Sequence, residues 1–153
     1  MKMIGLSAPS TMSLFAKIFG GRKSTPRDET PLVAEDAAPR EVILTGIDCV
    51  VRQHRGNCAT WTLESRPDHW IQFMNTVLNC HYPHKADPGV LFQELFNDPL
   101  VAEVVSFDPG THVTVELSSM SPGEIADWIE HYLAQVFSAD LPSERLTLEM
   151  NDF

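Results

Sequence analysis

VAEVVSFDPGTHVTVELSSMSPGEIADWIEHYLAQVF spans residues 101–137 and carries the strongest secondary-structure signals in the chain. Its first half predicts a β-hairpin, because two runs rich in β-branched residues, 101–107 and 112–117, flank Asp108–Thr111. Pro and Gly occupy the central positions of that tetrapeptide, as a type II turn prefers. The second run alternates, so we expect one set of its side chains to face the core: Val113, Val115 and Leu117.

The second half of this stretch predicts a long amphipathic helix. Ser121 and Glu124 have the spacing of a capping box, and Pro122 stands at the first helical position. A hairpin beside a helix with one apolar face is typical of an α+β domain, in which helices pack on an antiparallel sheet. The apolar face recurs every three or four positions: Ile125, Trp128, Ile129, Tyr132, Leu133, Val136 and Phe137.

Two upstream segments predict a further hairpin. Residues 41–52, EVILTGIDCVVR, are rich in β-branched residues, and residues 58–64, CATWTLE, alternate. Turn-forming residues lie between them at His54–Asn57. Both segments are therefore expected to be strands, which would make Cys49 and Cys58 cross-strand neighbours.

Residues 66–80 allow two interpretations. Ser65–Asp68 resembles a helix N-cap followed by an acid, and the apolar residues that follow have the spacing of one helical face. The alternative makes Trp70–Phe73 a strand and Asn75-Thr76 a turn. The spacing favours the helix, whose apolar face would hold Trp70, Phe73, Met74, Val77 and Leu78.

Two shorter elements complete the expected domain. Val90–Phe96 predicts a short helix that stops at Asp98-Pro99, and Arg145–Met150 alternates as a last strand. The order is roughly ββα(α)ββαβ. We expect a single α+β domain over residues 41–153, with two or three helices packed on an antiparallel sheet.

Residues 1–40 predict a flexible arm and linker that changes from basic to acidic. Residues 1–27 carry five Lys or Arg and no acid, so their charge is +5 and the rest of the chain carries −15 of a net −10. Prolines and small polar residues fill residues 20–40, which favours disorder. A short apolar patch lies within the arm, where it could contact an anionic membrane weakly, dock into a partner or remain a frayed terminus: Leu14, Phe15, Ile18 and Phe19.

Charge and cysteine content exclude several classes of function. An acidic body repels phosphate backbones, so we expect no nucleic-acid partner. The same charge attracts basic protein surfaces, or only keeps the chain soluble. Three cysteines do not suggest a disulfide framework, and no run of 18 apolar residues is present, so a reduced, cytoplasmic protein is expected.

The cysteines and histidines are the most chemically suggestive side chains. They contain no Cys-x-x-Cys pair, and the adjacent Cys80 and His81 would point apart on regular backbone. Cys80 and His84 are the only local pairing of nucleophile and base, and nothing orients them. We therefore expect neither enzyme activity nor a bound metal or cofactor from the set: Cys49, His54, Cys58, Cys80, His81 and His84.

Four other residues are candidates for partner binding. Glu124, Asp127 and Glu130 cluster on the polar face of the long helix, although such a cluster is also what a solvated helix face carries. Trp70 is a candidate interface anchor, because Trp dominates binding hot spots. Trp128 is expected in the core.

Three features of residues 58–150 together resemble a known family. They are Trp70-Ile-Gln-Phe73, the paired strands within Val101–Leu117, and the helix from Ser121 to Phe137. In this pattern the chain resembles the bacterial type III secretion chaperone-like, or YbjN-type, domains. The resemblance implies an acidic, non-catalytic α+β protein that binds another polypeptide, often as a dimer. It also implies a strand at Trp70–Phe73, against the helix that the spacing favours.

The sequence thus predicts a protein-binding domain. Our first hypothesis is a chaperone-like or adaptor protein that holds a partner chain against its sheet or helix face. The alternative is an immunity-type inhibitor whose acidic surface blocks a basic toxin. A Cys/His metal protein or hydrolase using Cys80, His81 and His84 is a distant third.

Overall fold

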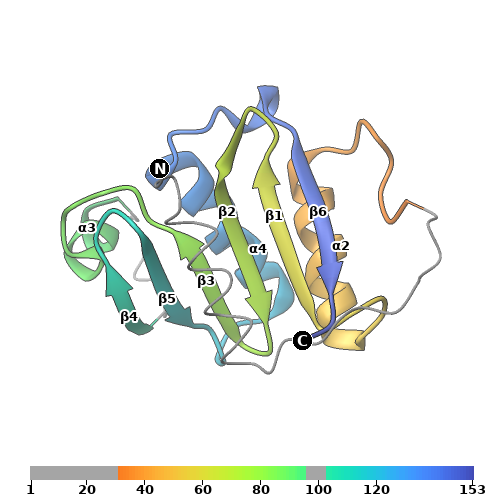
Figure 1. Ribbon diagram of the computed structural model, residues 1–153, viewed down its shortest axis with the longest axis horizontal. Coiled ribbons are helices and arrows are strands. Elements are labelled where there is room, and N and C mark those ends of the chain that lie inside the picture. The colour runs from red at the N-terminus through yellow and green to blue at the C-terminus, as the bar shows by residue number, and fades with distance from the viewer. Residues whose placement is uncertain (1–30, 96–102) are drawn as a thin grey trace, which may run out of the picture.

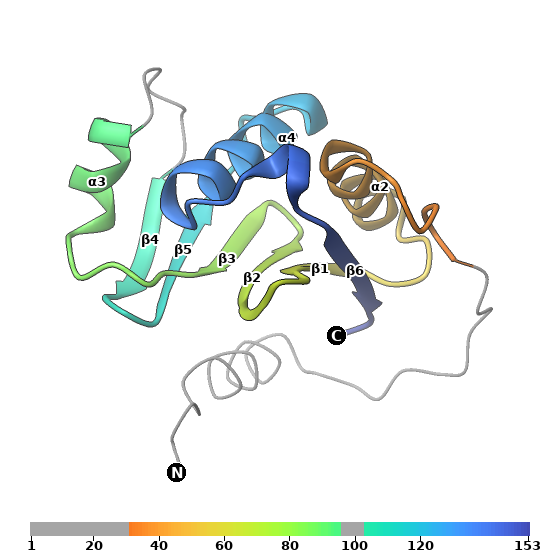
Figure 2. The same cartoon turned by 90° about the horizontal axis from the view of Figure 1, so that it is seen from above.

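The computed structural model describes residues 31–95 and 103–153, which form a six-stranded antiparallel sheet with helices on one face (Figures 1 and 2). The sheet order is β4-β5-β3-β2-β1-β6. Its strands are β1 (Cys58–Leu63), β2 (Arg66–Met74), β3 (Val77–His81), β4 (Glu103–Asp108), β5 (His112–Glu116) and β6 (Leu146–Asn151). The helices of the described residues are α2 (Pro39–Arg52), α3 (Pro88–Leu95) and α4 (Pro122–His131), with a π-turn at Tyr132–Val136 and a 3-10 turn at Leu141–Ser143.

The predicted α+β class, with helices packed on an antiparallel sheet, is confirmed. The hairpin β4–β5 closes through a hydrogen bond from the Thr111 amide to the Asp108 carbonyl (2.9 Å), and Gly110 has the positive φ of 80° that a type II turn needs. Helix α4 begins with the expected capping box, since Ser121 and Glu124 each accept a hydrogen bond from the other's amide. The apolar face of this helix is buried along its whole length.

The strand expected at residues 41–52 is wrong, because this segment forms helix α2. The β-branched residues hid a helical spacing: the buried positions of α2 recur at intervals of three and four, and Pro39 starts the helix. Cys49 therefore lies on a helix and is not a cross-strand neighbour of Cys58. Strand β1 instead pairs with β2 and β6.

The helix favoured for residues 66–80 is also wrong, and the alternative hairpin is correct. Strands β2 and β3 pair around Asn75-Thr76, and Asn75 takes the left-handed conformation (φ 59°) that Asn tolerates. Side chains on both faces of the last five residues of β2 are buried, so the apolar and polar alternation that marks a strand is absent there. The element order is αβββαββαβ rather than ββα(α)ββαβ.

The main core lies between the sheet and helices α2 and α4. Trp61 on β1 and Trp128 on α4 are both buried in it, and the Trp61 indole donates a hydrogen bond to the Val42 carbonyl of α2 (3.0 Å). Gly46 of α2 permits this contact, because a Cβ there would lie 2.5 Å from the Trp61 ring. The tryptophan and the glycine together set how closely α2 approaches the sheet.

The packed part of the chain begins within the expected linker. Val33 and Ala37 pack against the core, and Arg145 donates a hydrogen bond to the Glu35 carbonyl (2.6 Å). The apolar patch expected at Leu14–Phe19 lies outside the described residues. Within residues 31–95 and 103–153, no helix has the length and apolar character needed to cross a membrane.

Candidate binding face of the sheet

The face of the sheet opposite α2 and α4 is not crossed by any element of the described residues (Figure 2). We call it the helix-free face, because no helix of the described residues lies on it. The strand register defines which side chains share this face, because residues directly opposite each other on paired strands point the same way. Three rows of such residues cross the sheet. The central row is Glu149, Thr60, Gln72, Asn79, Thr114 and Ser106.

Several side chains on this helix-free face are buried as deeply as the core. Trp70, Gln72 and Asn79 are between 1% and 2% exposed, and Thr60 is 3% exposed. Trp70 is not part of the core between sheet and helices, and its ring lies 6.3 Å from that of His81. Such deep burial of polar side chains is unusual on a sheet face that no described element covers, since such a face is ordinarily solvated.

Hydrogen bonds satisfy only part of this polar row. The Gln72 amide donates to the Thr60 hydroxyl (3.3 Å), and the Thr114 hydroxyl donates to Asn79 (3.0 Å). Among the described residues, the buried side-chain atoms that find no hydrogen-bond partner all belong to this face: Trp70 Nε1, Gln72 Oε1, His112 Nδ1 and Glu116 Oε2. Buried polar groups are nearly always paired in folded proteins, so four unpaired atoms on one face are an unusual feature of this part of the structure.

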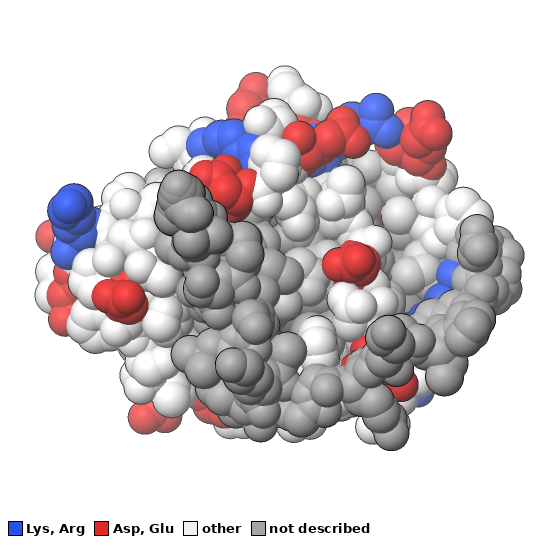
Figure 3. Space-filling model, in the orientation of Figure 1, with Lys and Arg blue, Asp and Glu red and all other residues white. Residues whose placement is uncertain are grey.

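The charge of the helix-free face is negative. The rows contain Glu149, Glu103, Glu116 and Asp108, and no Lys or Arg stands at any of the paired positions on this side. Figure 3 looks onto this face and shows a mostly uncharged surface among the coloured atoms, with acidic groups on it and Lys and Arg toward the rim. The face therefore favours a ligand with positive charge.

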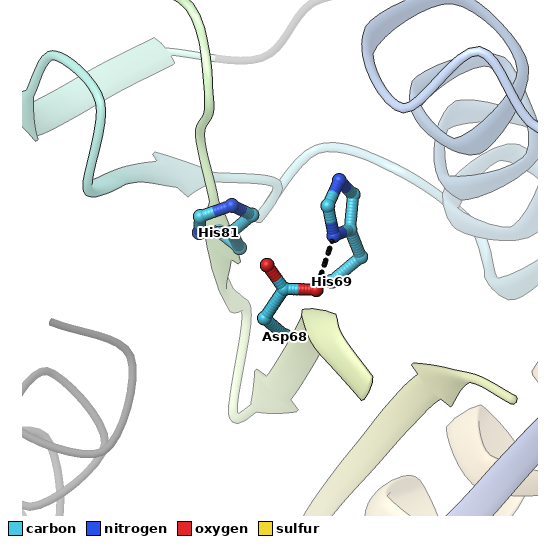
Figure 4. A group of neighbouring side chains, drawn as sticks. All are labelled: Asp68, His69 and His81. Atoms are coloured by element: carbon cyan, nitrogen blue, oxygen red, sulfur yellow. Dashed lines mark hydrogen bonds and ion pairs between the residues drawn. The ribbon is translucent and has the colours of Figure 1, made fainter. Parts of the chain in front are cut away.

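A second polar group lies where β2 begins and β3 ends. Asp68, His69 and His81 each place one potential ligand atom within 4.8 Å of the other two (Figure 4). His69 and Asp68 are joined by a hydrogen bond of 2.9 Å. Burial, with the neighbouring His69, lowers the pKa of His81. Burial is also the largest single effect on Asp68 and would raise its pKa, but the hydrogen bond and charge of His69, with smaller contributions from the backbone and His81, together lower it.

The four predicted partner-binding residues are not brought together. Trp70 lies on the helix-free face, whereas Glu124, Asp127 and Glu130 belong to α4 in the helix layer. Glu124 caps its own helix, and Arg40 of α2 pairs with Asp127 (2.8 Å) and with Glu130. All three acids thus have structural contacts, and those of Asp127 and Glu130 link α4 to α2.

The predicted set of Cys and His residues does not form one site. All three cysteines are buried and reduced, and burial raises the pKa of the Cys58 thiol to about 12 and that of Cys80 well above its usual range. Cys80 lies in the core, whereas His84 hydrogen-bonds the Val136 carbonyl (2.9 Å). Burial disfavours the thiolate, which is the nucleophilic form of cysteine, and the described contacts of Cys80 and His84 do not pair them.

Sequence reasoning missed most of the residues that the structure brings together here. Gln72, His112 and Glu116 come from three different strands, and only the register places them on one face. The available signal for this face was a polar residue within an otherwise apolar segment, namely Gln72 between Ile71 and Phe73. Asp68 and His69 gave no signal beyond their adjacency.

Comparison with known proteins adds no relative to this description. No family model, no curated protein and no solved structure matches the chain. The fold and its sites therefore define only a class: an α+β domain with a helix layer on one face of an antiparallel sheet and a buried, partly unpaired polar face on the other. The likeness to secretion chaperone-like domains stays a prediction.

Proposed function

We propose that this protein is a non-enzymatic polypeptide-binding domain, chaperone-like or adaptor, that holds a segment of another protein against the helix-free face of its sheet. The observation that carries the proposal is the set of unpaired buried atoms on that face: Trp70 Nε1, Gln72 Oε1, His112 Nδ1 and Glu116 Oε2. A ligand that pairs with them gains hydrogen bonds whose protein side is already desolvated.

A polypeptide has the chemistry to satisfy these atoms. The indole of Trp70 is a donor only, whereas Gln72 Oε1 and Glu116 Oε2 accept. A peptide backbone offers amide donors and carbonyl acceptors in regular alternation, so one segment can pair with both kinds. Trp70 supplies the large apolar contact that binding hot spots use.

The negative charge of the helix-free face should make it bind some peptides more tightly than others. Its four acids, with no Lys or Arg at the paired positions on this face, favour a segment in which apolar residues alternate with Lys or Arg. The same acids disfavour nucleic acid and anionic peptides.

A panel of short fluorescent peptides tests this proposal by anisotropy. The full chain should bind apolar peptides rich in Lys and Arg at least about tenfold more tightly than the same peptides with Glu and Asp in their place, and added salt should weaken binding. Trp70→Phe and Glu116→Gln should each reduce affinity severalfold, because each removes a hydrogen-bonding group or a charge that the peptide meets.

The matched control for these variants lies in the helix layer. The double variant Asp127→Asn, Glu130→Gln removes two acids of α4 and leaves the helix-free face intact. Its affinity for the same peptides should stay within about twofold of the parent. Loss of binding in this control, with Trp70→Phe unaffected, would place the interface on the helices and contradict the proposal.

A further inference from the structure

Asp68, His69 and His81 form a group of donors with the composition of a transition-metal site. Asp68 and His69 lie near the start of β2, and His81 is the last residue of β3. Two imidazoles and a carboxylate are ligands that Zn²⁺ and related divalent ions accept. One donor atom from each residue lies within 4.8 Å of the others, so a small closing movement brings all three to one ion (Figure 4).

We propose that Asp68, His69 and His81 bind one divalent transition-metal ion, Zn²⁺ in the first instance. Three protein ligands leave at least one coordination position for water or for a ligand atom from another molecule. The inference stands on this group alone and does not require the polypeptide-binding proposal.

The backbone already fixes the tautomer of His81 that a metal needs. The Thr111 carbonyl, 3.2 Å from His81 Nδ1, can only accept a hydrogen bond, so Nδ1 carries the proton and Nε2 carries the lone pair. Metal-binding histidines commonly donate their other nitrogen to a backbone carbonyl in this way, which orients the ring.

His69 is oriented by aromatic contacts and by Asp68. Its ring packs edge-on against Phe137 (4.7 Å between centroids) and against His81 (4.9 Å). A metal ion at His69 Nδ1 would replace the hydrogen bond to Asp68 Oδ1; in the neutral ring the Nδ1 proton then moves through solvent to Nε2, with no net release of a proton.

The change in ligand-atom separation that a metal requires is small. Ligand atoms around a tetrahedral zinc lie about 3.4 Å apart, given metal–nitrogen and metal–oxygen distances of about 2.1 Å. His69 and Asp68 already approach to 2.9 Å. The Asp68 side chain is 69% exposed and has room to rotate, whereas His81 is held in place by its surroundings.

Titration of the purified full chain with Zn²⁺ by calorimetry, and with Co²⁺ by visible absorption, tests the site. We expect one equivalent to bind, with a Co²⁺ spectrum typical of nitrogen and oxygen ligands. His69→Gln and His81→Gln should each weaken binding at least about tenfold, since each removes one of three ligands; Asp68→Asn should weaken it less. His54→Gln, an exposed histidine outside the group, is the matched control and should bind as the parent does.

Three results would overturn the proposal. They are the absence of stoichiometric binding, unchanged affinity in both His69→Gln and Asp68→Asn, or a thiolate-to-cobalt charge-transfer band, which would place the ion on a cysteine. If His81→Gln does not fold, the other two variants decide, because Asp68 and His69 lie nearer the surface. Peptide affinity measured in parallel with a metal chelator distinguishes this site from the polypeptide-binding function.

Discussion

Trp70 is the residue at which the proposed function can be separated most clearly from stability. Its side chain is 2% exposed, yet its indole N–H has no hydrogen-bond partner in the described residues and the ring stands outside the main core. A buried donor without an acceptor costs about 1–3 kcal/mol. Such a cost persists in natural proteins chiefly where a binding function requires the group.

Replacing Trp70 with Phe should therefore leave stability unchanged or raise it. The substitution removes the unpaired N–H and keeps an aromatic ring, although a smaller ring leaves some space. We expect the free energy of unfolding of Trp70→Phe, measured in urea, to stay within about 1 kcal/mol of the parent while peptide affinity falls. A loss of several kcal/mol would show that the indole N–H is satisfied and that the residue serves packing alone.

Two histidines at the end of the sheet should make stability sensitive to mild acid. Burial, with the neighbouring His69, lowers the pKa of His81 below its ordinary 6.5, and burial lowers that of His112 in the same direction. The unfolded chain then binds more protons than the folded chain below pH 6.5, so stability rises with pH across this window and is lost as pH falls through it.

Urea unfolding between about pH 7.5 and pH 5 measures this dependence. His81→Gln and His112→Gln should each flatten the fall in midpoint with acid, and His131→Gln, on an exposed helix position, should not. If the urea midpoint of both His81→Gln and His112→Gln falls with acid as steeply as that of the parent, these histidines do not cause the loss of stability. Asp68 acts in a separate, more acidic window, because its lowered pKa stabilises the fold above pH 3.8.

At the scale of elements, the sequence predicted best where local signals and tertiary environment agree. The turn at Asp108–Thr111 and the capping box at Ser121 are local chemistry, so β5 and α4 came out as expected. Helix α2 was mistaken because β-branched side chains are favourable in strands yet are tolerated on a buried helical face. Strand β2 was mistaken because burial on both faces of its second half erased the alternation.

The candidate binding face could not be predicted because it depends on register. Thr60, Gln72 and Asn79 become neighbours only when β1, β2 and β3 pair as they do. A shift by one residue would turn each of them toward the helices. Trp70 alone was recognised beforehand, from the general role of Trp in interfaces.

Gly46 tests how tightly α2 packs on the sheet. An added Cβ would lie 2.5 Å from the Trp61 ring and 3.0 Å from Leu148, so Gly46→Ala should destabilise the protein by about 1–3 kcal/mol despite the better helix propensity of Ala. Gly123→Ala is the matched control, because nothing lies within 4 Å of its Cβ position in α4. Its urea midpoint should stay the same or rise; equal gains in both variants would contradict the packing described.

In the molecule as a whole, the two faces of the sheet differ in what they carry. One face carries the main core and helices α2 and α4. Arg40 of α2 links the two helices by pairing with Asp127 and Glu130 of α4. The other face carries acids, an indole and unpaired polar atoms. The uneven charge of the sequence, +5 in residues 1–27 and −15 in the rest, adds a further asymmetry to the chain.

The basic arm has the chemistry that the helix-free face should accept, although it lies outside the described residues. Leu14, Phe15, Ile18 and Phe19 stand near Lys17, Arg22 and Lys23 in the sequence. A tethered segment acts at high effective concentration, so this patch should compete with added peptide. The full chain with Phe15→Ser and Ile18→Ser should therefore bind peptide severalfold more tightly than the parent. Unchanged or weaker binding would show that the arm does not compete.

Amide chemical-shift mapping gives the most direct test of the proposal that the helix-free face of the sheet holds a polypeptide. An apolar, Lys- and Arg-rich peptide is titrated into the isotope-labelled full chain, and the shifted amides are placed on the structure. We expect shifts in β1, β2, β3 and β5 around Trp70, Gln72 and Glu116, together with the indole N–H of Trp70. Shifts gathered on α2 and α4 around Asp127 and Glu130, or no saturable shift with any peptide, would contradict it.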